Sequence, residues 1–196
     1  MKCAVVCVGL YAVTSLAPCK GQNFDIDLLK GLNSSNPRAQ TYWMSTSNSV
    51  YYAGPTLVGA QLGYGLFAKD KTEMKRGFES ALSIGISLVI AGGVKNMINR
   101  PRPYQAYPNE IKTYSFTDGK SFPSGHTTLA FATATSLALE YKKWYITVPA
   151  FAWAASVGYS RMTLGKHYPT DVAAGAIVGI GSGYLSHWLT HKLFKY

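Results

Sequence analysis

The stretch PSGHTTLAFATATSLAL, residues 123–139, decides the fold. Ser124 is a favoured helix N-cap, and the uncharged run that follows predicts a helix that continues to Leu139. Runs of the same kind, rich in alanine, glycine, serine and valine, flank it at residues 50–68, 80–94, 144–160 and 172–186. No second domain is indicated, so the prediction is an all-α fold, a bundle of five to six helices.

The placement of charge favours a bundle that is integral to a membrane. Several runs are one turn shorter than the ~20 residues that span hydrocarbon, so length alone leaves a soluble bundle open. If the runs cross alternately with the amino terminus inside, the basic residues of the short connections all fall on the cytoplasmic side. These residues are Lys69, Lys71, Lys75, Arg76, Lys142, Lys143, Lys192 and Lys195. The net charge of +10 is scattered in short clusters, and this pattern argues against a nucleic-acid-binding face, which would gather its charge on one surface.

Small and aromatic residues fit the same interpretation. Close helix packing is predicted at residues 91–93 and 173–176 and at Gly179, Gly181 and Gly183. Aromatic rings stand near the ends of the runs, where amphipathic rings prefer a membrane interface. They belong to Tyr51, Tyr52, Trp144, Tyr145, Tyr159 and Trp188. The alternative is that these rings are ordinary core residues.

Residues 1–21 have the features of a secretory signal, with Lys2, an apolar run and small residues up to Gly21. Cleavage after Gly21 would remove every cysteine, since the three lie at positions 3, 7 and 19; a disulfide scaffold and a Cys-ligated zinc site are excluded. Two alternatives stay open, an uncleaved first membrane helix and a lipoprotein modified at Cys19. Residues 22–50 are predicted as a polar segment with an amphipathic helix, and residues 51–196 as the helical-bundle domain.

Three polar clusters lie at the ends of the runs, all on the outer side in this threading. They are KNMINRPRP (residues 95–103), PSGH (123–126), and SR (160–161) with HYPTD (167–171). Lys95, Arg102 and Arg161 supply fixed cations, and the planar guanidinium suits phosphate oxygens. Gly125, which follows the Ser124 cap, leaves backbone N–H groups open to an anion. The pattern indicates a site for an oxyanion of phosphate size.

Two histidines add chemistry to this site. Pro169 at the first helical position places Asp171 in the first turn, from where its carboxylate can orient His167 and raise its nucleophilicity. His126 is the second histidine. Since His167 and Asp171 serve each other and no other cluster has ligand spacing, no metal or other cofactor is predicted. The set indicates phosphoryl transfer through a covalent intermediate.

These residues resemble the type-2 phosphatidic acid phosphatase superfamily, whose pattern is Lys, six residues, Arg-Pro; then Pro-Ser-Gly-His; then Ser-Arg, five residues, His, three residues, Asp. All eleven fixed positions of the pattern are present between Lys95 and Asp171. The resemblance implies that His167 is the nucleophile, Asp171 its orienting partner, and His126 the general acid that later activates water. It also implies that the phosphoryl oxygens are held by Lys95, Arg102, Ser124, Gly125 and Arg161.

The function predicted from this resemblance is a metal-independent phosphatase acting on a lipid phosphate or pyrophosphate at the periplasmic face of the bacterial inner membrane. The alternative is a soluble periplasmic acid phosphatase for small phosphomonoesters. Two further readings are a vanadate-dependent haloperoxidase and an idle envelope protein that binds anionic lipid. The implied partners are the lipid substrate and the membrane, and oligomeric state stays open.

Some neighbouring residues are given other roles. Arg100 has no lysine seven residues upstream and is predicted to contact headgroups or to snorkel to the interface. Lys166 is expected either to add to the positive electrostatic field of the site or to be a solvated charge in a loop. His187 and His191 are expected at the cytoplasmic interface. Four aromatic residues lie in the loop between the first two clusters: Tyr104, Tyr107, Tyr114 and Phe116. They are expected either to form a lid or a lipid-facing wall, or simply to pack within the loop.

Overall fold

The structure, a computed structural model, describes residues 19–193. The signal predicted at residues 1–21 therefore lies almost wholly outside the described residues. Every regular element within them is a helix: α2 (Cys19–Leu32), α3 (Pro37–Asn48), α4 (Val50–Phe67), α5 (Lys71–Met97), α6 (Pro103–Ala106), α7 (Gly125–Tyr141), α8 (Trp144–Thr163) and α9 (Pro169–Leu193). The predicted all-α class is confirmed.

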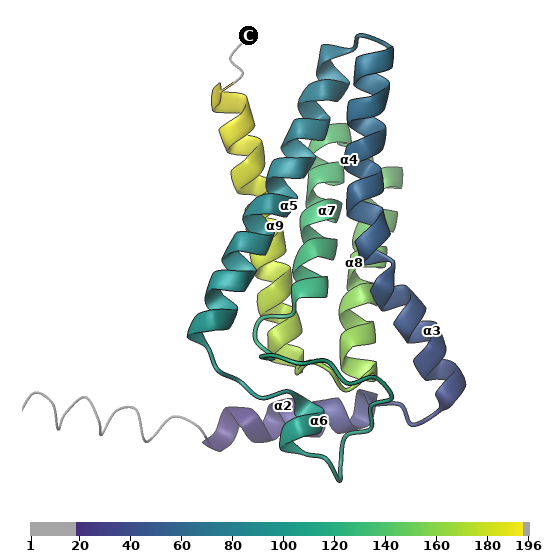
Figure 1. The fold of residues 1–196 in the computed structure, drawn as a ribbon, viewed down its shortest axis with the longest axis vertical. Coiled ribbons are helices and arrows are strands. Elements are labelled where there is room, and N and C mark those ends of the chain that lie inside the picture. The colour runs from purple at the N-terminus through teal and green to yellow at the C-terminus, as the bar shows by residue number, and fades with distance from the viewer. Residues whose placement is uncertain (1–18, 194–196) are drawn as a thin grey trace, which may run out of the picture.

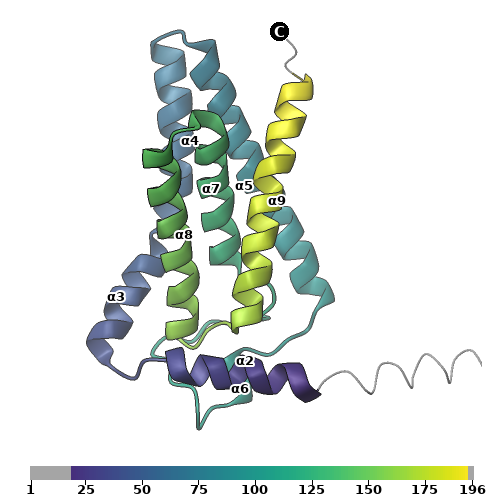
Figure 2. The same cartoon turned by 180° about the vertical axis from the view of Figure 1, so that it is seen from behind.

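The bundle is made of α4, α5, α7, α8 and α9, which lie side by side in Figures 1 and 2. Each of the five predicted runs forms one of these helices. The start of α5 lies nine residues before its predicted run, because the Asp70 carboxylate caps it by accepting a hydrogen bond from the Thr72 N–H at 2.8 Å. Pro169 opens α9 at its first position, as predicted.

Glycines bring α9 close to α7. A Cβ atom added to Gly175 would lie 2.7 Å from the carbonyl oxygen of Ser124, and one added to Gly183 would lie 2.6 Å from a methyl carbon of Thr135. Only glycine permits this approach, and it lets the Ser124 N–H donate to the Asp171 carbonyl at 3.1 Å. The close packing predicted for this part of α9 is confirmed, and it sets the first turn of α9 beside the start of α7.

Three other glycines do not bring two helices close together. Gly92 and Gly93 of α5, and Gly181 of α9, are exposed and have open space where a side chain would be. The prediction of close helix packing at these three positions is wrong, because each of them lies on a face of its helix that points away from the bundle.

The bundle buries many small polar side chains beside a core cluster of alanines and valines, and it exposes large apolar ones. Ser83 and Ser87 of α5 are buried, whereas Leu88 and Val89 of the same helix are 52% and 75% exposed. Among the described helices, α5 and α9 are long and apolar enough to cross a membrane, and only 33% and 28% of their most apolar windows are buried. A soluble core helix can meet the same length and composition, but its apolar side chains face inward.

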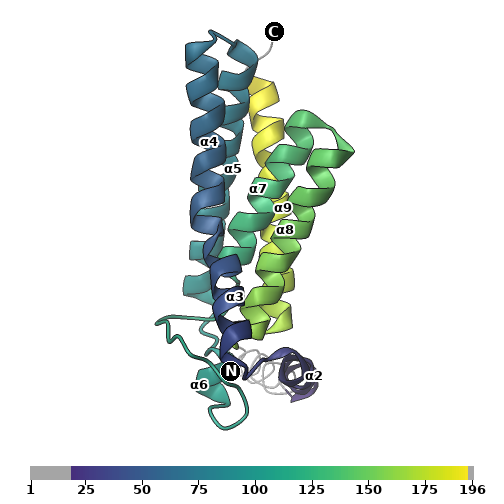
Figure 3. The same ribbon diagram turned by 90° about the vertical axis from the view of Figure 1, so that its right-hand side faces the viewer.

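Helices α2 and α6 cover one end of the bundle, while α3 runs beside α8 (Figures 2 and 3). The amphipathic helix predicted in residues 22–50 is present as α2, with Ile26 and Leu29 buried against Tyr104 and Tyr168. The loop from 98 to 124 crosses the same end. This end carries the C-termini of α5 and α8 and the N-termini of α7 and α9, so it is where the three polar clusters meet.

Candidate active site

The structure brings the eight predicted site residues to one end of the bundle. Lys95 lies in the last turn of α5, and Arg161 in the last turn of α8. Ser124 caps α7, and Gly125 and His126 are its first residues. Arg102 caps α6, His167 lies in the turn between α8 and α9, and Asp171 lies in the first turn of α9. Lys95 is near enough to Arg102, Arg161 and Asp171 for their charges to act on it.

His167 and Asp171 form a buried pair. The imidazole is 2% exposed and the carboxylate is fully buried. The His167 Nδ1 atom lies 3.5 Å from the Asp171 Oδ2 atom and has no closer polar partner among the described residues. Asp171 Oδ2 also accepts from the Tyr168 N–H at 3.0 Å and from the Ser121 hydroxyl. The carboxylate is thus fixed from several sides and faces the imidazole, as the sequence predicts.

The contact with Arg102 indicates which nitrogen of His167 carries the proton. Its Nη1 atom lies 3.4 Å from His167 Nε2 and 3.3 Å from the Lys166 carbonyl oxygen. Because a guanidinium can only donate, the Nε2 atom beside it must carry the lone pair, and the proton sits on Nδ1 toward Asp171. Burial, together with the charges of Arg161 and Arg102, lowers the pKa of His167 to about 3. The imidazole is therefore neutral at physiological pH.

The walls of the site are cationic. Arg161 is 3% exposed, its Nη1 atom donates to the Ser47 hydroxyl at 2.6 Å, and its Nε–H lacks a partner among the described residues. Lys166 is 4% exposed and donates to the Ser115 hydroxyl at 3.1 Å. Burial, and then the charges of Arg161 and Arg102, lower the pKa of Lys166 to about 8. The alternative of a solvated loop charge is therefore wrong for Lys166, which lines the site.

The start of α7 faces the same space. The Ser124 side chain makes no cap hydrogen bond, and its hydroxyl pairs with that of Thr127 at 2.8 Å. The first N–H groups of the helix are thus left for another acceptor, which favours an anion there. A Cβ atom on Gly125 would meet open space. The ring of His126 packs edge-to-face on that of Tyr51, with 4.9 Å between centroids.

Arg100 departs from its predicted role. Its guanidinium donates to Asp171 Oδ1 and to Asp25 Oδ2, both at 2.7 Å, and stacks 3.8 Å from the centre of the Tyr168 ring. The expectation that Arg100 contacts headgroups or snorkels is wrong. The side chain is drawn inward because Asp25, 75 residues away on α2, and Asp171 are buried carboxylates that need a partner.

Two residues that contact the site lie in residues 22–50, a segment that contains no recognisable motif. Asp25 of α2 binds Arg100, and Ser47 of α3 binds Arg161. Asp25 also accepts from the Thr170 N–H at 3.1 Å, which adds a tie to the start of α9. The sequence around Asp25 and Ser47 contains no motif that would identify them. Their roles become visible only through their contacts with Arg100 and Arg161, which are distant in the sequence.

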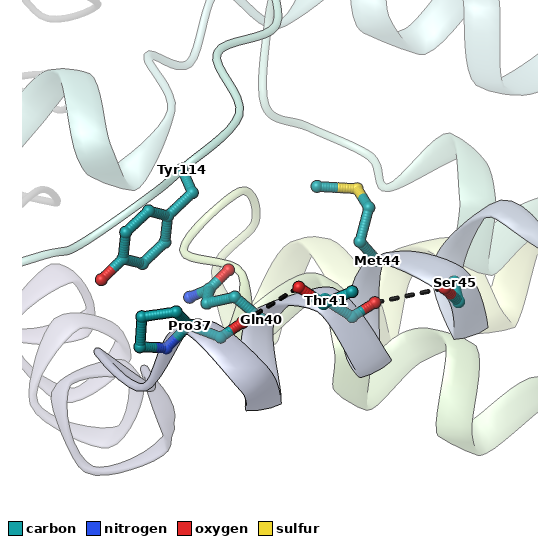
Figure 4. Close-up of a pocket in the computed structure, with 6 residues that line it drawn as sticks. All are labelled: Pro37, Gln40, Thr41, Met44, Ser45 and Tyr114. Carbon is teal, nitrogen blue, oxygen red and sulfur yellow. Dashed lines mark hydrogen bonds between the residues drawn. The ribbon is translucent and has the colours of Figure 1, made fainter.

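A pocket of about 300 Å³ lies between α3 and the 98–124 loop. Figure 4 shows Tyr114 across from Pro37, Gln40 and Thr41, with Met44 and Ser45 along the same helix. Tyr114 donates through its hydroxyl to the Ser35 carbonyl at 2.9 Å. Of the predicted loop aromatics, Tyr114 therefore forms a wall of this pocket, whereas Tyr104 is buried in the core.

The comparisons with known proteins agree with this site. The PAP2 superfamily profile matches residues 76–195, which is more than half of the chain. The lipid A 1-phosphatase of Porphyromonas gingivalis is 32% identical over 136 residues, covering 68% of this chain and 28% of that protein. The undecaprenyl-diphosphatase of Sulfolobus acidocaldarius is 32% identical over 117 residues, covering 59% of this chain and 56% of that one. The chain thus spans only part of the length of these relatives.

The fold also has a solved counterpart. A transmembrane PAP2 type phosphatidylglycerolphosphate phosphatase from Bacillus subtilis superposes with a TM-score of 0.75, covering 95% of this chain and 94% of that chain. At 20% sequence identity this likeness concerns the fold alone. Together with the profile match, which spans every fixed position of the motifs from Lys95 to Asp171, it leads to one conclusion. The chain belongs to the PAP2 superfamily.

Proposed function

We propose that the chain is a membrane phosphatase that hydrolyses a lipid phosphate or pyrophosphate through a phosphohistidine on His167, without a metal, at the periplasmic face of the inner membrane. The observation that carries the proposal is the neutral, buried imidazole whose Nε2 lone pair faces buried cations while Asp171 stands behind its Nδ1 atom. This arrangement suits nucleophilic attack on the phosphorus of a phosphoryl group whose oxygens the cations hold.

The residues act in two steps. In the first, Arg102 turns from Nε2 to the phosphoryl oxygens, the Nε2 lone pair forms the N–P bond, and the bond from phosphorus to the leaving oxygen breaks. His126 takes up a proton when the phosphate dianion binds beside it and gives that proton to the leaving oxygen, and Asp171 stabilises the charge on His167. In the second step, neutral His126 takes a proton from water, whose oxygen attacks phosphorus as the N–P bond breaks. Lys95 and Arg161 hold the phosphoryl charge throughout.

The outer surface of the bundle supports a membrane location. The large apolar side chains of α5 and α9 face outward over a core of small polar residues. The predicted interfacial rings are exposed, which argues against the core alternative: Tyr51, Tyr52, Trp144, Tyr145, Tyr159 and Trp188 are between 38% and 77% exposed. The turns at Lys69–Lys71 and Lys142–Lys143 lie toward the end of the bundle opposite the site (Figure 1). By the positive-inside rule this supports a site on the outer side.

An apolar groove supports a lipid as the substrate. The groove has a volume of about 480 Å³, is lined by residues of α7, α8 and α9, and opens to the outside of the bundle. Its walls include Met162 and Val172, which directly follow Arg161 and Asp171 of the site in the sequence. A chain lying in this groove would have its headgroup beside His167. The relatives named above act, by their names, on lipid A and on undecaprenyl diphosphate.

The test is a substrate panel assayed with purified protein in detergent and in the presence of EDTA. It contains undecaprenyl pyrophosphate, phosphatidylglycerol phosphate, phosphatidate, a lipid A phosphate and p-nitrophenyl phosphate. We expect activity in EDTA, inhibition by vanadate as a mimic of the trigonal-bipyramidal, pentacoordinate transition state, and a higher kcat/KM for long-chain lipids than for short-chain analogues. Activity that needs a divalent ion would contradict the mechanism.

The same panel tests the alternative function. Equal kcat/KM for p-nitrophenyl phosphate and every lipid would indicate an open aqueous site and favour a soluble acid phosphatase. Release of the protein by osmotic shock without detergent would likewise contradict the membrane location.

Filling the groove should remove the preference for long chains. Ala155 lines the groove and is exposed, so Ala155→Trp should block it without disturbing the core. We expect kcat/KM to fall at least tenfold for a long-chain substrate, since each buried CH₂ contributes about 0.8 kcal/mol, and to stay within about twofold for a short-chain one. Ala152→Trp is the matched control, because Ala152 is an exposed residue of the same helix outside the groove. Equal losses in both variants would contradict a chain-binding groove.

Lys166 should make substrate binding sensitive to pH. Since its pKa is lowered to about 8, the free enzyme loses this cation as the pH rises through 8, while a bound phosphate restores the proton. We expect KM to rise above pH 8 with a smaller change in kcat. Lys166→Met should have a raised KM at pH 7 and lack this rise, and Lys166→Arg should keep a low KM at both pH values. The assignment fails if the Lys166→Met enzyme retains the same alkaline rise in KM.

A further inference from the structure

A second cluster of polar side chains lies far from the active site. Glu79 of α5 and His187 and His191 of α9 place their ligand atoms within 4.8 Å of one another. Along α9 the 16 residues from Asp171 to His187 correspond to about 24 Å. The sequence shows His187 and His191 one turn apart, but Glu79 joins them only through the packing of α5 on α9.

The geometry of the cluster is set by the two helices. The His187 Nδ1 atom lies 2.5 Å from Glu79 Oε1, and the rings of His187 and His191 have centroids 4.3 Å apart. The Ser186 hydroxyl donates to the Glu79 carbonyl at 2.7 Å, which fixes the register of α9 against α5 at this level. Glu79 is 3% exposed and His191 is exposed, so the cluster runs from the interior to the surface. An ion can therefore enter from solvent.

We propose that Glu79, His187 and His191 bind one Zn²⁺ ion that joins α5 to α9. Two imidazoles at positions i and i+4 lie on one helix face, and a carboxylate from a neighbouring helix supplies the third ligand. Imidazole and carboxylate are ligands that zinc accepts at about 2.0–2.2 Å. To bind one ion, the His187 Nδ1 and Glu79 Oε1 atoms must move apart from their present hydrogen-bond distance of 2.5 Å, and the exposed His191 ring must rotate toward them. This site lies outside the proposed phosphatase chemistry and does not depend on it.

The surroundings leave room for further ligands. A cavity of about 190 Å³ is lined by these three residues and by Glu140, so water can complete the coordination shell. Glu140 accepts hydrogen bonds from Gln61 at 2.6 Å and Ser80 at 2.7 Å, and it adds a carboxylate near the ion.

Three cations also line this cavity, Lys75, Arg76 and Lys142. Arg76 is paired with Glu73 and lies over the Tyr141 ring, 4.6 Å from its centre. Lys142 is exposed, so water screens its charge. Lys75 is the remaining cation near the imidazoles, and Lys75→Gln is expected to tighten zinc binding.

The experiment uses the full chain, purified in detergent through an affinity tag without histidine and stripped with EDTA. Binding of Co²⁺, followed by its visible absorption, and then of Zn²⁺ by displacement, gives stoichiometry and affinity without reference to activity. We expect one equivalent, and a rise in the unfolding temperature with added Zn²⁺. His191→Ala and Glu79→Gln should each weaken binding by more than about tenfold, since even outer-shell losses cost 10- to 100-fold.

The chain has four histidines, so the other two provide the controls. His126→Ala and His167→Ala should bind Co²⁺ with unchanged affinity, although they lack phosphatase activity or most of it. Because His191 is exposed, His191→Ala is expected to fold, and an unchanged far-ultraviolet circular dichroism spectrum checks this. The proposal is overturned if Co²⁺ binding is absent, or persists unchanged in His191→Ala and Glu79→Gln, or disappears in His167→Ala.

Discussion

His167→Ala should abolish turnover of every substrate, because the variant loses the nitrogen that forms the covalent intermediate. The loss is expected to be at least about 10⁴-fold in kcat, as for other residues that act as the nucleophile. His191→Ala is the matched control, since it removes an exposed histidine at the far end of the bundle. Residual activity within tenfold of the wild type would contradict the assignment of the nucleophile.

The intermediate itself can be trapped. Brief mixing with ³²P-labelled substrate, followed by an alkaline quench, should leave a label on the wild-type protein that acid removes and that His167→Ala lacks. Full labelling of His167→Ala would place the phosphoryl group elsewhere.

His126→Ala tests the proton-transfer step separately. It should slow turnover by about 10²–10⁴-fold when the leaving group is an alkoxide. With p-nitrophenyl phosphate, whose leaving group needs no proton, the first step should be nearly normal, and the phosphoenzyme should accumulate because water is no longer activated. An equal loss with both kinds of substrate, without accumulation, would mean that His126 does not act as the general acid.

The sequence predicted the bundle well because its signals are local. The uncharged runs and Pro169 at the first position of α9 each specify a helix from a few neighbouring residues, and the glycines at 175, 179 and 183 share one face at helical spacing. The site residues in the motifs were also found, since the motifs lie at helix ends and helix ends meet when the bundle forms. Their proposed roles still rest on the experiments above.

What the sequence did not predict depends on distant partners. Arg100 was assigned to the surface because its local context offers no carboxylate, yet Asp25 reaches it from α2. Lys166 was left between two roles, because only the packed 98–124 loop, through Ser115, buries it. The cluster proposed to bind zinc was not predicted for the same reason, since Glu79 and His187 are 108 residues apart.

Arg100→Met should destabilise the protein and impair catalysis together. Arg100 is the only described guanidinium bonded to both Asp25 and Asp171, whose side chains are 3% and 0% exposed, so its removal leaves two buried carboxylates without their cation. Breaking a buried pair costs about 3–5 kcal/mol, which corresponds to a fall of roughly 6–20 °C in the unfolding temperature measured in detergent. We also expect a lower kcat with little change in KM, because Asp171 loses the contact that aims it at His167.

A double variant separates the two effects. The Arg100→Met/Asp25→Asn double variant has one unpaired buried carboxylate instead of two, so it should regain part of the lost stability. Its kcat should stay low, because Asp171 still lacks its arginine partner. Arg100→Lys should rescue neither fully, because one ammonium cannot bond both carboxylates in the forked geometry of a guanidinium. If the double variant unfolds at the same temperature as Arg100→Met, the two carboxylates are not coupled through Arg100. If kcat is normal in all three variants, Arg100 does not position Asp171, and the orientation of His167 then rests on Ser121 and the Tyr168 N–H alone.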